Sequence, residues 1–191
     1  MVSCLMGDST ALASAIVRCC LNKIDFYCGA FLSFLVSNGV EPTLFEAGDK
    51  SRILEFLLKQ TKYKAFLKYS AKKHSAVKQG KTVYRWDIGF SQKECELLEQ
   101  FGDPNRNVVI VCVCTDPDMK ETDFAILSYE DARKCMGLGE DRTNEQRRIS
   151  VQYVKGSSKL RCYGTGLSSD NAVETPHNYE KVFGLTSEEE E

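Results

Sequence analysis

The hydrophobic pattern of this chain changes period near residue 80, and this change constrains the fold more than any other feature. Between Ser51 and Ser70, apolar residues recur at helical spacing in the segment SRILEFLLKQTKYKAFLKYS. From residue 81 onward, β-branched and aromatic residues alternate with polar ones, beginning with the segment KTVYRWDIGF. We therefore predict an α+β fold in which a helical part precedes a sheet.

Helices are expected throughout the first part of the chain. One helix is indicated over residues 11–23, and a second starts at Asp25 and stops at the Asn-Gly pair at 38–39. The long pattern over residues 51–70 favours one helix or two shorter ones that meet near Thr61, and residues 72–81 are expected to be a frayed end and linker. Residues 1–80 are thus predicted to form a helical subdomain whose C-terminal segment is basic.

The remaining chain has the order βαββαβ followed by one extra strand. Two Ser-x-x-acid sequences, Ser91 with Glu94 and Ser128 with Asp131, have capping-box spacing and indicate short helices. The segment NVVIVCVC is apolar on both faces, which is typical of a central strand. Residues 81–166 are therefore predicted to form a small mixed or antiparallel sheet with two helices. The expected strands are residues 81–90, 107–114, 122–127, 148–155 and 159–164.

Composition excludes several classes of protein. The 191 residues carry 25 Lys and Arg against 27 Asp and Glu, with 42% hydrophobic residues, which is ordinary for a globular chain and unlike collagen or a coiled-coil rod. The longest apolar run, residues 26–36, is about half of the roughly 20 residues that cross a bilayer, so we expect no membrane span. Residues 167–191 are polar and weakly patterned, and they end in the acidic sequence SEEEE.

Nine cysteines suggest a disulfide framework until their positions are considered. Their number is odd, most of them lie in apolar segments, and residues 1–8 lack the basic start of a secretory signal. We therefore expect a reduced cytoplasm, in which cysteine serves as a small buried hydrophobic residue. The cysteines are Cys4, Cys19, Cys20, Cys28, Cys95, Cys112, Cys114, Cys135 and Cys162.

Positive charge is concentrated in one stretch of the chain. No Asp or Glu occurs between Glu55 and Asp87, and the rest of the chain has an excess of acids. Because clustered lysines neutralise phosphates and release counterions, this stretch is predicted to dock on nucleic acid or on an acidic protein surface. Helical spacing would place Lys64, Lys68 and Lys72 on one outer stripe. The predicted surface comprises Lys59, Lys62, Lys64, Lys68, Lys72, Lys73, Lys78, Lys81 and Arg85.

Other interpretations of the basic residues stay open. A solvated helix face would carry the same lysines, and a helix-turn-helix would use the segment AKKHSAVKQ at residues 71–79 as its recognition helix. A second, smaller basic group consists of Arg142, Arg147 and Arg148, just before an expected strand. These arginines suit a phosphate or a carboxylate, but they also offset the acids beside them in the sequence.

Catalytic and metal-binding motifs are weak in this sequence. Asp118 and Lys120, with Asp103 upstream, resemble the acid-x-Lys element of metal-dependent nucleases, but they fall in an expected turn. Cys112 and Cys114 share one face of a strand, yet the chain has no C-x-x-C pair and only two histidines to complete a zinc site. We therefore predict no catalytic residue, no metal site and no cofactor.

These features favour a binding protein over an enzyme. We expect an intracellular, non-catalytic protein that docks on nucleic acid or on a nucleoprotein complex through residues 59–85. Small chains of this character often serve phages and other mobile elements as regulators or inhibitors of host nuclease complexes, as anti-CRISPR proteins do. The alternatives are a metal-dependent nuclease that uses Asp103, Asp118 and Lys120, and an interaction module for an acidic protein partner.

Overall fold

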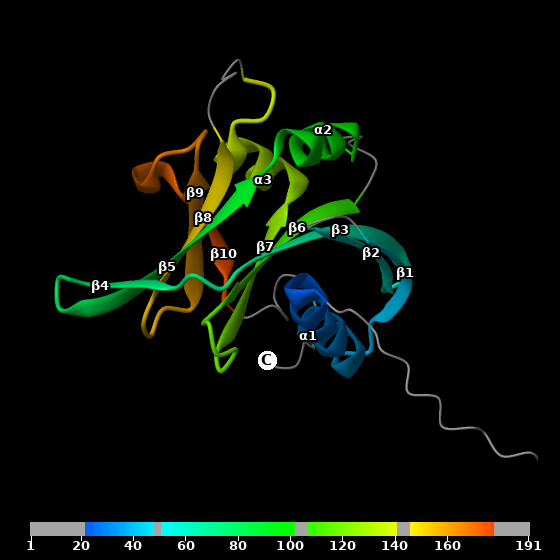
Figure 1. Cartoon of the computed structure of the whole chain (residues 1–191), viewed down its shortest axis with the longest axis horizontal. Helices are drawn as coiled ribbons and strands as arrows, with labels where there is room; N and C mark the ends of the chain where they lie inside the picture. The colour runs from blue at the N-terminus through cyan, green and yellow to red at the C-terminus, as the bar shows by residue number, and fades with distance from the viewer. Residues whose placement is uncertain (1–21, 48–50, 102–106, 141–145, 178–191) are drawn as a thin grey trace, which may run out of the picture.

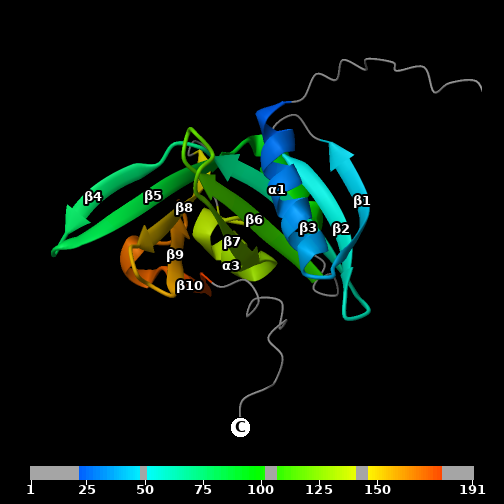
Figure 2. The same cartoon turned by 90° about the horizontal axis from the view of Figure 1, so that it is seen from below.

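Two five-stranded sheets pack face to face in the computed structural model of the chain, which describes residues 22–47, 51–101, 107–140 and 146–177 (Figure 1). The helices are α1 (Lys23–Ser37), α2 (Gln92–Phe101) and α3 (Tyr129–Met136), with a short 3₁₀ helix η1 (Ser169–Asn171). Helix α1 covers the face of one sheet that points away from the other sheet (Figure 2), whereas α2 and α3 contribute to the core between the sheets.

Sheet A has the strand order β1-β2-β3-β6-β7. Among its described strands β3 and β6 are parallel, and every other neighbouring pair is antiparallel. The parallel pair requires the chain to leave sheet A after β3 and to return to it at β6. The strands are β1 (Glu41–Ala47), β2 (Arg52–Leu58), β3 (Thr61–Ser70), β6 (Asn107–Thr115) and β7 (Thr122–Ser128).

Sheet B has the strand order β10-β9-β8-β5-β4 and is antiparallel throughout its described part. Strand β4 forms one edge of this sheet and pairs with β5. The chain therefore builds β4, β5 and α2 between the two parallel strands of sheet A. The strands are β4 (His74–Lys78), β5 (Lys81–Phe90), β8 (Arg147–Val154), β9 (Lys159–Gly164) and β10 (Val173–Pro176).

Strand β6 is buried on both faces because it lies inside sheet A between two cores. Ile110 and Cys112 face the core between the sheets, whereas Val111 and Val113 face α1. The two sheets are also joined by a hydrogen bond, since the indole N–H of Trp86 in β5 donates to the carbonyl oxygen of Thr115 at 2.8 Å. Burial of each large apolar side chain in these cores contributes about 2 kcal/mol.

The start of helix α1 is held by the carboxylate of Asp25, which accepts hydrogen bonds from the N-cap residue of α1 and from strand β2. The backbone N–H of Asn22 donates to Asp25 at 2.8 Å, and Arg52 in β2 donates to the same carboxylate at 2.9 and 2.6 Å. Asp25 therefore lies inside the first turn. The expected start of the helix at Asp25 is corrected, because the N-cap residue is Asn22. The predicted end is confirmed, because α1 ends at Ser37 with Asn38 as its C-cap, and Gly39 follows with a φ of 71°.

The prediction of helices over residues 51–70 is wrong, because the structure places β2 and β3 there, and β4 occupies part of the expected linker. Strand β3 is buried on both faces, with Phe66 toward sheet B and Leu67 toward α1, so its apolar run lacks the alternation of a half-buried strand. The turn that joins β2 to β3 has Lys59 and Gln60 at φ values of 46° and 66°. Neither residue is a Gly or Asn, so the usual sequence signal of a two-residue hairpin is missing.

The predicted α+β class is confirmed, and so is the order of elements within residues 81–166. Both capping-box helices form, with the backbone N–H of Asp131 donating to the Ser128 hydroxyl at 3.1 Å. The expected single sheet is corrected, because β6 and β7 belong to sheet A whereas β5, β8 and β9 belong to sheet B. Sheet A thus joins strands from both sides of residue 80, the boundary expected between two subdomains.

Some expectations concern residues that the structure does not describe. The helix expected over residues 11–23 falls there, apart from its last two positions, and so does the acidic end of the chain. Residues 167–177, expected to be weakly patterned, contain η1 and β10. None of the described helices combines the length and the apolar character that a bilayer crossing requires.

Candidate functional site

Strand β4 is exposed along its whole length, and with the first half of β5 it forms a hairpin that projects from sheet B (Figures 1 and 2). All five residues of β4 are exposed, and Val77 has 74% of its surface accessible. The turn has Gln79 and Gly80 at φ values of 49° and 75°, the left-handed conformation that a tight two-residue hairpin requires. The hairpin therefore offers both faces of β4 to solvent.

The outer face of this hairpin, which points away from sheet A, is cationic at both ends. In the β4–β5 ladder His74 lies opposite Arg85, and Lys78 lies opposite Lys81. Lys72 is exposed just before β4. Within the described part of the chain, none of these three lysines takes part in an ion pair. We call Lys72, His74, Lys78, Lys81 and Arg85 the hairpin surface.

The middle of the outer face is small and apolar, because Ala76 lies opposite Val83. The aromatic side chains of β5 point to the inner face, where the rings of Tyr84 and Tyr153 stack with 6.2 Å between their centroids. Trp86 lies on the same inner face and is 1% exposed. The outer face of the described hairpin thus presents charged and small side chains together with His74, but no Phe, Tyr or Trp ring.

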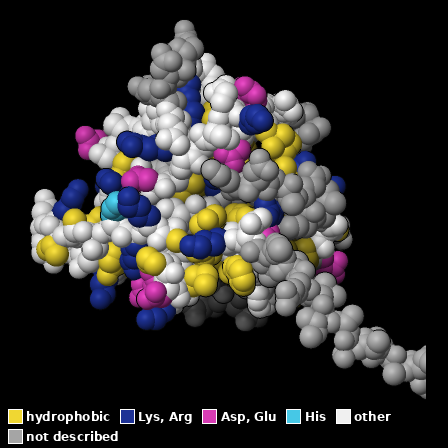
Figure 3. Space-filling view, in the orientation of Figure 1, with side chains coloured by type: hydrophobic (Ala, Val, Ile, Leu, Met, Phe, Trp, Pro, Cys, Tyr) yellow, Lys and Arg dark blue, Asp and Glu magenta, His cyan; other side chains and the backbone are white. Residues whose placement is uncertain are grey.

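The cationic row continues from the hairpin onto neighbouring strands of sheet B. Arg85 lies opposite Gln152 in β8, and Gln152 lies opposite Arg161 in β9. Arg85 is also 3.3 Å from Asp87, which accepts a hydrogen bond from Ser150 at 2.6 Å. Figure 3 shows Lys and Arg side chains over the region where Figure 1 labels β4 and β5.

Two lysines of the predicted surface lie instead against a carboxylate of β2. The Nζ atoms of Lys62 and Lys64 are 2.5 and 3.5 Å from the carboxylate oxygens of Glu55. The hydrogen bond from Lys62 lowers the pKa of Glu55, although partial burial opposes that shift. Lys64 also lies 4.5 Å from the ring centroid of Phe101, and Lys59 occupies the exposed turn before β3. Lys62 and Lys64 therefore lie against an acid of the fold rather than around a vacant anion site.

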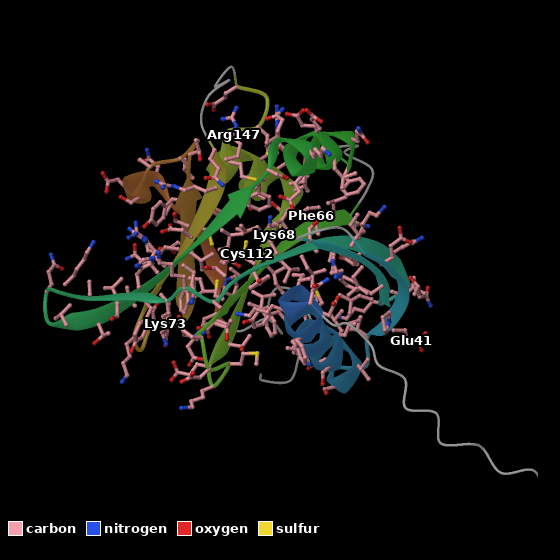
Figure 4. All side chains as sticks on the ribbon, in the orientation of Figure 1. Glu41, Phe66, Lys68, Lys73, Cys112 and Arg147 are labelled. Atoms are coloured by element: carbon pink, nitrogen blue, oxygen red, sulfur yellow. The ribbon has the colours of Figure 1, made fainter. Side chains whose placement is uncertain are left out.

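Lys68 is buried in the core between the sheets with only 7% of its surface exposed (Figure 4). Its Nζ donates to both carboxylate oxygens of Glu94 at 2.9 and 2.8 Å and lies 5.4 Å from the ring centroid of Phe90. Burial by itself would raise the pKa of Glu94, but hydrogen bonds from Lys68 and Ser91 outweigh it and lower that pKa. Lys68 therefore holds α2 against β3.

Lys73 anchors the segment that crosses from sheet A to sheet B. Its Nζ lies 2.6 Å from Glu121 and 4.1 and 5.7 Å from the ring centroids of Tyr84 and Trp86. Burial alone would lower the pKa of Lys73, but the hydrogen bond to Glu121 reverses that effect and the pKa is raised. Lys73 is thus charged and already bound within the fold.

The predicted helical stripe of Lys64, Lys68 and Lys72 is wrong, because β3 is a strand. Lys64 and Lys68 point toward sheet B as alternate residues of β3, and Lys72 lies beyond its end. The sequence did not reveal the burial of Lys68, because its partner Glu94 is 26 residues away. Glu94 was also already explained as the acid of the capping box with Ser91. It also left His74 outside the predicted surface.

Arg147 and Arg148, two arginines of the smaller basic group, lie in different surroundings. Arg147 donates to the carbonyl oxygens of Met136 and Glu140 at 3.4 and 2.8 Å, so it fixes the chain that follows α3. Arg148 is exposed on the outer face of sheet B. Arg142 lies outside the described residues. Binding of a phosphate or a carboxylate by these arginines stays a prediction.

The nuclease residues do not gather into a site within the described part of the chain. Asp118 and Lys120 lie in an exposed turn, 3.5 Å apart, and Asp103 falls outside the described residues. The described residues contain no group of three or more His, Cys, Asp or Glu side chains placed to hold a metal ion. His177 lies 2.8 Å from Asp123, and this pair belongs to the contact between β10 and β7.

The six described cysteines are buried free thiols. Cys112 and Cys114, which were considered as metal ligands, lie in the core between the sheets. Burial raises the pKa of Cys112 to about 12 and that of Cys135 to about 12, so neither thiol ionises near neutral pH. These side chains therefore act as core residues.

The chain was compared with protein families, curated proteins and solved structures. No protein-family model matches the chain, no curated protein matches it, and no solved structure matches it. The function must therefore be argued from the residues themselves.

Proposed function

We propose that the chain is a non-catalytic binding protein that docks on nucleic acid through the hairpin surface. The observation that carries this proposal is the accumulation of cations on a projecting hairpin whose three lysines have no acidic partner among the described residues. Phosphate contacts of this kind supply affinity that depends little on sequence. The binding surface is narrower than the one predicted from the sequence, because Lys62, Lys64, Lys68 and Lys73 already face acids of the fold.

The biological use that we attach to this surface is control of a nucleic-acid-targeting complex. A protein that occupies nucleic acid without cleaving it competes with nucleases and other enzymes for the same phosphates. Inhibition of a nuclease complex, as anti-CRISPR proteins achieve it, is one activity of this type. A reduced cytoplasm is the compartment that suits the six buried free thiols.

The test is a titration of the full chain with DNA and RNA across a salt series, followed by fluorescence anisotropy. The variant Lys72→Ala/Lys78→Ala/Lys81→Ala should lose most of the affinity. Its plot of log K against log salt should become shallower by up to about 3, because each phosphate contact contributes roughly 0.9 to the slope.

A matched control removes the same charge from exposed lysines elsewhere. The variant Lys93→Ala/Lys120→Ala/Lys134→Ala should bind as the unmodified protein does, because these lysines lie on α2, on the turn after β6 and on α3. Equal losses in both triple variants would mean that net charge alone matters, and the proposal would fail. Absence of binding to any nucleic acid at low salt would favour the alternative, an acidic protein partner.

A further inference from the structure

We infer that the nucleic acid is B-form duplex DNA and that the β4–β5 hairpin lies across its major groove. This inference rests on the proposed function and adds the class of nucleic acid and the mode of contact. The major groove of B-DNA is about 12 Å wide and about 8.5 Å deep, which admits a two-stranded ribbon. The hairpin has the required form, because both faces of β4 are open to solvent.

The spacing of charge on the outer face matches the walls of that groove. The pair of Lys78 and Lys81 is four residues along the ladder from the pair of His74 and Arg85. At about 3.4 Å per residue this separation is roughly 14 Å, slightly more than the groove width. A hairpin that crosses the groove therefore brings Lys78 and Lys81 to one phosphate ridge and Arg85, with His74 opposite it, to the other.

The side chains between the two pairs do not hold the hairpin away from the mouth of the groove. Ala76 is exposed at the centre of the outer face, and Val83 opposite it is small, uncharged and only 8% exposed. Such short side chains place no bulk between the hairpin and the groove and form no hydrogen bonds with base edges. The mode of contact thus predicts affinity that comes mainly from phosphates, with weak dependence on base sequence.

The same face is poorly suited to the other forms of nucleic acid. Single strands bind mainly through aromatic rings that stack on bases, but the outer face of the described hairpin has no Phe, Tyr or Trp side chain. Tyr84 points to the inner face, which leaves the imidazole of His74 as the one aromatic ring of the described outer face. A-form RNA duplexes have a deep, narrow major groove that a ribbon of side chains does not enter. Duplex DNA is the form that satisfies both restrictions.

The experiment compares three probes of the same sequence and about 20 nucleotides per strand: duplex DNA, duplex RNA and single-stranded DNA. We expect the full chain to bind duplex DNA at least about 10-fold more tightly than either of the others at equal salt. A DNA duplex whose pyrimidines carry a bulky group at C5 should bind weakly, because that group fills the major groove.

Two variants test the orientation of the hairpin. Ala76→Glu places a carboxylate at the centre of the outer face and should reduce affinity for duplex DNA about as much as the loss of several lysines. Ala30→Glu makes the same change on the exposed side of α1 and should leave the affinity unchanged. Circular dichroism and thermal unfolding should confirm that both variants are folded.

The outcomes separate this inference from the proposed function. Equal affinity for all three probes, or undiminished binding to the C5-blocked duplex, would overturn the groove inference while leaving nucleic-acid binding in place. Binding to none of the three probes would overturn the proposed function itself. An unchanged affinity of the Ala76→Glu variant would show that the outer face of the hairpin does not contact the DNA.

Discussion

At the scale of single residues, the ion pair between Lys68 and Glu94 shows how burial decides what a charge does. Both side chains are removed from water, at 8% and 12% exposure, and each satisfies the other through two hydrogen bonds. Removal of one partner from a buried pair leaves a charge without compensation, which costs more than the pair itself contributes. Lys68 is therefore a residue of the core despite its chemical type.

Replacement of Lys68 by methionine should destabilise the fold. The variant Lys68→Met keeps the length of the side chain but leaves Glu94 without its cation, and we expect the free energy of unfolding to fall by about 3 kcal/mol. Urea denaturation measures the loss. The double variant Lys68→Met/Glu94→Gln should lose less than the sum of the single changes, and Lys93→Met on the exposed side of α2 should lose little. A neutral Lys68→Met variant would contradict the structural role.

The same pair predicts a dependence of stability on pH. The pKa of Glu94 is lowered in the folded state from its ordinary value of 4.5, so the folded protein binds this proton less readily than the unfolded chain does. The stability that Glu94 contributes is therefore present above about pH 4.5 and is lost as the pH falls through the folded pKa. Urea denaturation at several pH values should show a shallower acid loss for Glu94→Gln. Identical slopes would exclude this carboxylate as a source of acid sensitivity.

At the scale of elements, the β2–β3 turn is held in a conformation that its residues disfavour. Gln60 has a φ of 66°, which costs a side chain with a Cβ atom about 1 kcal/mol relative to glycine. The variant Gln60→Gly should therefore raise the free energy of unfolding by up to about 1 kcal/mol. The comparison is Gln152→Gly in β8, where glycine should lower stability. Thermal denaturation distinguishes the two, and a loss of stability in Gln60→Gly would contradict the turn geometry.

Elements with local signals were predictable from the sequence, and elements defined by distant partners were not. Helices α2 and α3 follow Ser-x-x-acid sequences whose hydrogen bonds join residues three positions apart. Strand β3 instead depends on β6 and α1 for its burial, and its turn lacks glycine. The basic stretch was visible in the sequence, but its division into paired lysines and the hairpin surface required the register of the strands.

At the scale of the whole molecule, the two sheets depend on each other because each is built from separated parts of the chain. Strand β6 has β3 as its parallel neighbour, and Val111 and Val113 are covered by α1. A fragment of residues 81–191 would expose that face and one edge of β6. We expect it to show no cooperative thermal transition, and a mixture with residues 1–80 should regain one. A cooperative transition in the isolated fragment would support the subdomain boundary expected from the sequence.

The parallel pairing of β3 with β6 also has a kinetic consequence. Phe66 meets Ile110 across this pair, so sheet A closes only after the chain between them has been gathered into β4, β5 and α2. Closing so long a loop costs conformational entropy, and this cost arises before the stabilising contacts between β3 and β6 are made. Refolding of this protein should therefore be slow for its size, and newly made chains should leave the β6-facing edge of β3 unpaired until β6 has been made.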